Sequence, residues 1–160
     1  MVNHTTLATT LGLALQQRGY LLSLAESCTG GMAAQAVTSI AGSSSWFDRG
    51  FITYSNSAKV DMLNVSNATI ETYGAVSEQT ATEMAIGTLK NSRSHIAASI
   101  TGIAGPSGGS VEKPVGTVCF AWVGTHLTIS TSTQLFEGDR DSIRQQATEF
   151  MLSALIKKLA

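Results

Sequence analysis

A serine that follows an apolar stretch and precedes two glycines is the first candidate for chemistry in this chain. It is Ser27, within Ala-Glu-Ser-Cys-Thr-Gly-Gly at 25–31. The pattern predicts a strand that passes into a helix, and the free N–H groups at a helix N-terminus can hold an oxyanion or a phosphate. Glycines also let a substrate approach the backbone closely. Serine is equally a common helix N-cap, and this segment alone favours that structural role.

A nucleophilic serine needs a base, and lysine is the residue type that this chain best offers. The chain has three histidines, none with an acidic partner at a suggestive spacing: His4, His95 and His126. Lys59 follows a β-rich stretch, and Tyr54 or Asn56 could orient it. Ser-Lys pairs are known variants of the catalytic triad, but a lysine with its ordinary pKa of about 10.4 is protonated at neutral pH. Lys59 therefore needs a desolvated site to act as a base, and the alternative is an exposed lysine on a short helix.

A glycine-rich segment supplies a third candidate site. Residues 101–110 read Thr-Gly-Ile-Ala-Gly-Pro-Ser-Gly-Gly-Ser, directly after a predicted strand. Such a loop can cradle an anion with its backbone N–H groups, although it matches neither the P-loop nor the dinucleotide-binding fingerprint. A flexible loop without a ligand is the alternative. Lys113 and Arg140 could add positive charge, Glu26 could orient a hydroxyl or satisfy backbone donors, and Arg140 could simply pair with its flanking aspartates.

The composition bounds the class of protein that carries these candidates. The chain has 160 residues, and we expect a single domain over 1–160. Ten basic and eleven acidic side chains give a net charge of −1, which argues against a nucleic-acid partner. Charged residues make up only 13% of the chain, against about 25% in a typical soluble domain. They are absent from 27–47, 94–111 and 115–136, which indicates a sheet that is buried on both faces.

Cysteine usage and hydropathy predict a cytoplasmic protein. Cys28 and Cys119 form no disulfide framework, so we expect two reduced, buried thiols. No signal-like N-terminal block and no apolar run long enough to span a bilayer is evident, so no membrane association is expected. No cluster of His, Cys and carboxylate side chains has metal-ligand spacing, so we predict no metal and no cofactor.

The elements that must position the candidates alternate between helix and strand. Strands are predicted over 20–25, 50–54, 96–100, 115–123 and 127–136, the last two as a hairpin turning at 124–125. Helices are predicted from about residue 7 to Gly19, over 30–40, from Ser55 or Asn56, over 77–90, and from Asp139 or Asp141 onward. This alternation indicates an α/β sandwich with helices on both faces, and the hairpin makes the sheet mixed with one strand reversed. The pattern does not give the strand order.

Taken together, the three segments resemble the CinA C-terminal domain family. The matching motifs are Ala-Glu-Ser-Cys-Thr-Gly-Gly at 25–31, Gly-x-x-x-Tyr-Ser-Asn-x-x-Lys at 50–59 and Thr-Gly-Ile-Ala-Gly-Pro-x-Gly-Gly at 101–109. Lys-Pro-Val-Gly-Thr-Val at 113–118 and Gly-Asp-Arg at 138–140 complete the similarity, which extends over nearly the whole chain. The resemblance implies a three-layer α/β/α sandwich with a mixed, mostly parallel five-stranded sheet. The N-terminal molybdopterin-binding-like domain of longer relatives is not expected here.

The resemblance also implies an activity and a site. The implied reaction is hydrolysis of the carboxamide of nicotinamide mononucleotide to nicotinate mononucleotide and ammonia, in pyridine-nucleotide salvage. The matching catalytic positions are Ser27 as nucleophile and Lys59 as base, with Tyr54 nearby. We expect the substrate to be bound by Glu26, Thr29, Gly30, Gly31, Thr101, Gly102, Ala104, Gly105 and Arg140.

Several expectations remain open at this point. Cys28 is a rival nucleophile, although we expect it to face the core. N–H groups of residues 29–31 or of the glycine loop are expected to stabilise the tetrahedral oxyanion. A catalytically silent nucleotide-binding or regulatory module on the same scaffold, or an amidase acting on a related small amide, is the alternative function. The expected partner is a small-molecule nucleotide, and a homo-oligomer, most simply a dimer, is favoured.

Overall fold

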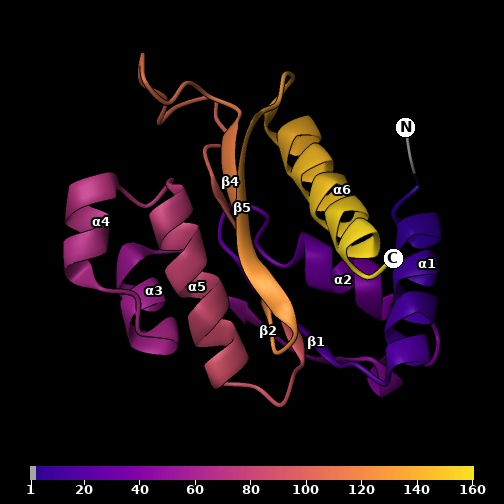
Figure 1. Ribbon diagram of the computed structural model, residues 1–160. Helices are drawn as coiled ribbons and strands as arrows, with labels where there is room; N and C mark the ends of the chain where they lie inside the picture. The colour runs from indigo at the N-terminus through magenta and orange to yellow at the C-terminus, as the bar shows by residue number, and fades with distance from the viewer. Residues whose placement is uncertain (1–2) are drawn as a thin grey trace.

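The computed structural model describes residues 3–160 and is built on one five-stranded sheet (Figure 1). Its strands are β1 (Leu22–Glu26), β2 (Phe47–Ile52), β3 (Ile96–Gly102), β4 (Thr117–Gly124) and β5 (Leu127–Leu135). They lie in the order β2-β1-β3-β4-β5. β1 pairs in parallel with both β2 and β3, whereas β4 is antiparallel to both β3 and β5. The expected reversal of a single strand is confirmed, because only β4 runs against the others.

Helices cover both faces of the sheet, which confirms the three-layer α/β/α arrangement (Figure 1). On one face lie α1 (His4–Arg18), α2 (Met32–Thr38) and α6 (Arg140–Lys158), which pack on one another. On the other face lie α3 (Asn56–Leu63), α4 (Asn67–Tyr73) and α5 (Glu78–Lys90), of which α5 makes the contact with β1, β3 and β4. A short 3-10 helix, Ser43–Ser45, leads into β2.

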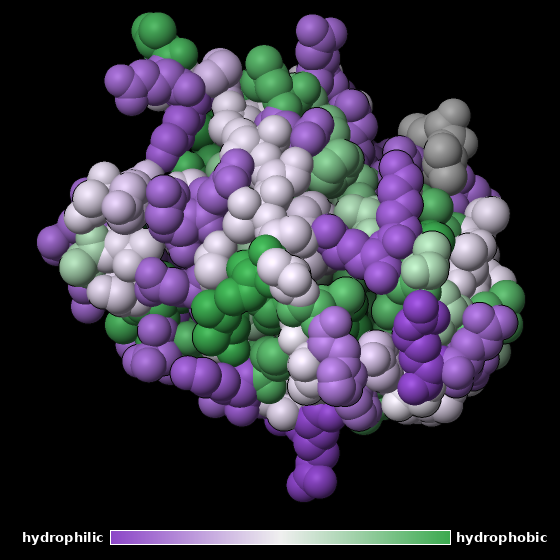
Figure 2. Space-filling view, in the orientation of Figure 1, coloured by the Kyte–Doolittle hydropathy of each residue, from purple (hydrophilic) through white to green (hydrophobic). Residues whose placement is uncertain are grey.

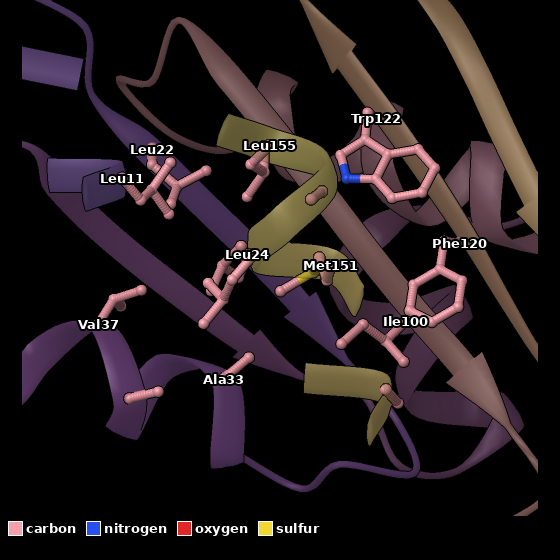
Figure 3. Close-up of a cluster of buried hydrophobic side chains, with 14 of the residues drawn as sticks. Leu11, Leu22, Leu24, Ala33, Val37, Ile100, Phe120, Trp122, Met151 and Leu155 are labelled. Carbon is pink, nitrogen blue, oxygen red and sulfur yellow. The ribbon is translucent and has the colours of Figure 1, made fainter. Parts of the chain in front are cut away.

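The larger core lies between the sheet and the helices α1, α2 and α6. Figure 3 shows side chains from β1, β3 and β4, among them Leu24, Ile100 and Phe120, meeting Leu155 and Met151 of α6. All five are completely buried. The core under α5 is built mainly from small residues, so α5 can lie close to the sheet. Two of the uncharged stretches, 94–111 and 115–136, contain the strands β3 and β4, which are buried on both faces. The stretch 115–136 also contains β5, whose residues are partly exposed, and 27–47 contains α2.

The ends of the predicted elements follow the expected capping chemistry, with two differences. Ser55, Ser77 and Asp139 each accept a hydrogen bond from a backbone N–H at the start of a helix, and Gly19 ends α1 in the left-handed region. β2 begins at residue 47 instead of 50 and ends at 52, so Thr53 and Tyr54 belong to the loop before α3. The helix α4 was not predicted, because it is seven residues long and buries none of them.

The strand order places the candidate segments at a single edge of the sheet. β1 lies between β2 and β3 and is parallel to both, so the carboxyl ends of all three strands meet. Ser27 follows β1, the segment 53–59 follows β2, and the glycine loop follows β3. Ligands of open α/β sheets bind at this edge. No helix within residues 3–160 is long and apolar enough to cross a membrane.

Candidate active site

Ser27 and Lys59 are brought into direct contact at the carboxyl ends of β1 and β2. The Lys59 Nζ lies 3.0 Å from the Ser27 Oγ, although the two residues are 32 positions apart in the sequence. Ser27 is fixed by its N–H, which donates to the Ile100 carbonyl of β3. Lys59 comes from the first turns of α3, whose start is set by the Ser55 hydroxyl as N-cap. The geometry therefore offers a nucleophile with an adjacent base.

Burial shifts Lys59 towards its neutral amine. The side chain is 1% exposed, and this burial lowers the pKa of Lys59 below its ordinary value. Its Nζ also lies 3.0 Å from the Thr53 carbonyl and 3.3 Å from the Tyr54 carbonyl. A neutral amine can donate its two hydrogens to these carbonyls, which leaves its lone pair for the Ser27 hydroxyl. The same three contacts hold the nitrogen where a neutral amine can accept the proton of the Ser27 hydroxyl.

Glu26 is buried behind the serine and supports the turn. One carboxylate oxygen accepts from the Thr29 hydroxyl (2.6 Å) and from the N–H groups of Gly31 (3.2 Å) and Ala33 (3.0 Å). The other accepts from the N–H of Ala34 at 2.9 Å. Glu26 therefore caps α2, which begins at Met32 and has no N-cap side chain of its own. The structure shows both roles considered for this carboxylate, because Glu26 orients the Thr29 hydroxyl and satisfies three backbone donors.

Cys28, the rival nucleophile, faces the core as expected. Its side chain is 6% exposed and packs in the larger hydrophobic cluster. Burial raises the pKa of the Cys28 thiol to about 11. A thiol reacts as the thiolate, so Cys28 is poorly suited to nucleophilic attack at neutral pH.

A cavity of about 280 Å³ opens beside the Ser27–Lys59 pair. Its lining comes from all three carboxyl-end segments, from the loop between α4 and α5 and from the start of α6: Ser27, Cys28, Tyr54, Asn56, Lys59, Ala75, Val76, Thr101, Gly102, Ile103, Ala104, Gly105, Ser107, Gly108 and Arg140. Glycine is required at Gly102, because a Cβ there would lie 2.7 Å from the Val118 Cγ2. None of the three histidines lines this cavity.

Arg140 joins two sides of the cavity. Its Nη1 donates to the Gly105 carbonyl at 2.7 Å, and its Nη2 donates to the Tyr54 hydroxyl at 3.1 Å. Tyr54 is 62% exposed and contacts the Ser27–Lys59 pair through its backbone carbonyl, while its hydroxyl faces Arg140. Lys113, the other cation considered, lies elsewhere, because its Nζ donates to the Tyr73 carbonyl and it lines a separate cavity.

The structure thus divides the predicted site residues into two groups. Those that line the cavity are Ser27, Tyr54, Lys59, Thr101, Gly102, Ala104, Gly105 and Arg140. Those that belong to the turn and do not line the cavity are Glu26, Thr29, Gly30 and Gly31. The Gly30 N–H donates to the Ser27 carbonyl and the Gly31 N–H to Glu26, so both amides are already engaged. Contact of either group with a substrate stays a prediction.

Sequence reasoning did not single out Arg144, which contacts the serine turn. Its guanidinium donates to the carbonyls of Cys28 and Thr29, each at 3.0 Å. The available signal was its position four residues after Arg140, one turn further along the same helix. Within residues 3–160, no group of three or more His, Cys, Asp or Glu side chains could hold a metal ion.

Comparison with known proteins agrees with this architecture. The model of the CinA C-terminal domain matches residues 4–159. The nicotinamide-nucleotide amidohydrolase PncC of Enterobacter agglomerans is 52% identical over 95% of this chain and 93% of its own length. The protein of the same name from Escherichia coli K12 is 54% identical over 91% of this chain and 88% of its own length. The crystal structure of the competence/damage inducible protein CihA from Agrobacterium tumefaciens superposes with a TM-score of 0.96 at 43% identity, covering 100% of this chain and 98% of that one. The chain belongs to the CinA C-terminal domain family.

Proposed function

We propose that the protein is an amidohydrolase that converts nicotinamide mononucleotide and water to nicotinate mononucleotide and ammonia, in pyridine-nucleotide salvage. The observation that carries the chemistry is the 3.0 Å contact between the Ser27 Oγ and the buried Lys59 Nζ. The substrate is supported by the two relatives at 52% and 54% identity that are named nicotinamide-nucleotide amidohydrolase. No cofactor enters the proposed reaction.

The proposed mechanism uses Lys59 as base and then as acid. Neutral Lys59 takes the proton of Ser27 while the Oγ attacks the carboxamide carbon. The resulting ammonium gives its proton to the departing nitrogen, which leaves as ammonia, and Ser27 is left as the nicotinoyl ester. Lys59 then takes a proton from water, whose oxygen attacks the ester carbon, and returns it to the Ser27 oxygen.

The tetrahedral oxyanion needs hydrogen-bond donors, each worth about 3–4 kcal/mol. Because the N–H groups of Gly30 and Gly31 are engaged inside the turn and Thr29 does not line the cavity, we assign this role to the glycine loop. This loop lines the cavity through Gly102, Ala104 and Gly105. Tyr54 is proposed to position Lys59 through its backbone carbonyl, which accepts from the Nζ at 3.3 Å.

Arg140 is proposed to hold the phosphate of the nucleotide. Its guanidinium lies at the cavity and can form the paired hydrogen bonds that a phosphate accepts. It is presented by the first turn of α6, where the helix dipole also favours an anion. The neutral partners of Arg140, a carbonyl and a phenol, leave its positive charge available to a phosphate.

The test compares nicotinamide, its riboside and its mononucleotide by ammonia release. The wild type should turn over the mononucleotide far better than the riboside, and Arg140→Gln should raise KM for the mononucleotide while leaving the riboside unchanged. Equal turnover of all three amides would favour an amidase of other specificity. Binding of the mononucleotide without any ammonia release would favour a catalytically silent module.

We further propose a cytoplasmic homodimer. The two cysteines are free and buried, as expected for a reducing compartment. The edge strand β5 has no charged residue, and its exposed side chains include Ile129 and Leu135. Figure 2 shows hydrophobic residues gathered on the surface between α5 and the lower part of β5. Light scattering after size-exclusion chromatography should give twice the mass of the chain, and a monomer at micromolar concentration would contradict the dimer.

A further inference from the structure

Arg144 holds the serine turn by two backbone carbonyls. Its Nε donates to the Cys28 carbonyl and its Nη2 to the Thr29 carbonyl, both at 3.0 Å and across more than a hundred residues of sequence. The two carbonyls are consecutive, so the planar guanidinium fork engages two adjacent peptide planes. No carboxylate within residues 3–160 lies within 4.0 Å of this guanidinium. The guanidinium of Arg144 therefore interacts with the carbonyls of the turn and not with an acidic side chain.

Glu26 and Arg144 stabilise the turn through different backbone groups, Glu26 through N–H groups and Arg144 through carbonyls. Glu26 accepts from N–H groups at the start of α2, as far as Ala34, while Arg144 donates to the carbonyls that precede them. The segment between includes Gly30 and Gly31, both with positive φ, and glycine leaves the backbone more conformational freedom than residues with a Cβ do. Without Arg144, two carbonyl acceptors of this flexible segment would lose a charge-assisted partner.

We propose that Arg144 is a positioning residue for catalysis, which fixes the peptide planes after Ser27 and thereby keeps the Ser27 Oγ at the Lys59 Nζ. It lines no part of the cavity and so does not contact the substrate. The first of the two held peptide planes, Cys28–Thr29, is separated from Ser27 by a single plane, Ser27–Cys28, so a displacement of the held plane is transmitted through Cys28 to the Ser27 Oγ. A shift of about 1 Å in a reacting group can cost about 100-fold in rate.

This inference rests on the proposed amidase function, and its first test is a split between kcat and KM. Arg144→Ala should lower kcat for nicotinamide mononucleotide about 100-fold while KM changes less than threefold. Arg144→Lys, which offers a point charge in place of a fork, should lose about tenfold. The matched control is Arg49→Ala, because Arg49 also donates to a backbone carbonyl, that of Asn91, away from the site. Its kcat should stay at the wild-type value.

Chemical rescue separates positioning from a general loss of folding. Ethylguanidinium chloride at millimolar concentration should raise the kcat of Arg144→Ala in a saturable way and leave the wild type unchanged. A wild-type kcat in Arg144→Ala would overturn the proposal. The proposal would also be overturned if ethylguanidinium did not raise the low kcat of Arg144→Ala and Tm fell by the same amount in Arg144→Lys and Arg144→Ala.

A third measurement needs no substrate. Amide hydrogen exchange of Gly30 and Gly31 should be at least tenfold faster in Arg144→Ala, while the amides of α1 stay unchanged. If the wild type releases no ammonia from the mononucleotide, the proposed function fails on its own. The anchoring of the turn by Arg144 is then decided by this exchange, and unchanged rates at both glycines would refute it.

Discussion

Replacement of Lys59 by methionine tests the base directly. At the ordinary lysine pKa of 10.5, about one molecule in a thousand would carry a neutral amine at pH 7.5. Every unit by which burial lowers this pKa raises that fraction about tenfold, until the amine is mostly neutral. Removing a positioned base typically costs about 10²–10⁴-fold in rate. We therefore expect Lys59→Met to lower kcat by about 10³-fold, and Ser27→Ala by a similar factor.

The dependence of kcat/KM on pH tests which protonation state of Lys59 is active. Below its pKa Lys59 is protonated and inactive, so kcat/KM should rise about tenfold per pH unit and then level off below pH 10.5. Because the two residues act as one unit, the double variant should be no slower than either single variant. The exposed Lys157→Met serves as control and should leave the profile unchanged. A profile that still rises at pH 10.5, or additive losses in the double variant, would refute the Ser-Lys reasoning.

Three further variants test the supporting parts of the site. Cys28→Ala should keep kcat within threefold of the wild type, because the thiol is buried with a pKa of about 11; loss of turnover would instead identify Cys28 as the nucleophile. Glu26→Gln should lower the free energy of unfolding by about 1–3 kcal/mol in urea titrations, because an amide offers one acceptor oxygen where the carboxylate accepts from four donors. An unchanged free energy of unfolding would contradict the capping role. Gly105→Ala should raise KM for the mononucleotide, because Gly105 has φ of +78° and a Cβ there would clash with Val115 Cγ1. An unchanged KM would show that this loop does not shape the cavity.

The sequence was sufficient to place Ser27 and Lys59 at one edge of the sheet, whereas their pairing came from the family resemblance. Ser27 and Lys59 each follow a strand that reads as β-structure, and parallel strands bring such positions to the same edge. The role of Glu26 was not predictable, because a carboxylate beside a strand end can face either the cavity or the helix that follows. Arg144 was out of reach for a different reason: its partners lie 115 and 116 residues away, and only the packing of α6 on α2 brings them together.

The scarcity of charge has a physical role at this site. A carboxylate near Lys59 would stabilise its ammonium and oppose the lowering of its pKa by burial. The acidic side chain nearest in sequence to Ser27, that of Glu26, instead accepts from four donors of its turn and of α2. The two arginines at the site donate to neutral oxygens, Arg140 to a carbonyl and a phenol and Arg144 to two carbonyls. With each charge held by uncharged partners, Lys59 is left without an acidic neighbour, and its desolvation can favour the free amine that an amide hydrolysis of this kind requires.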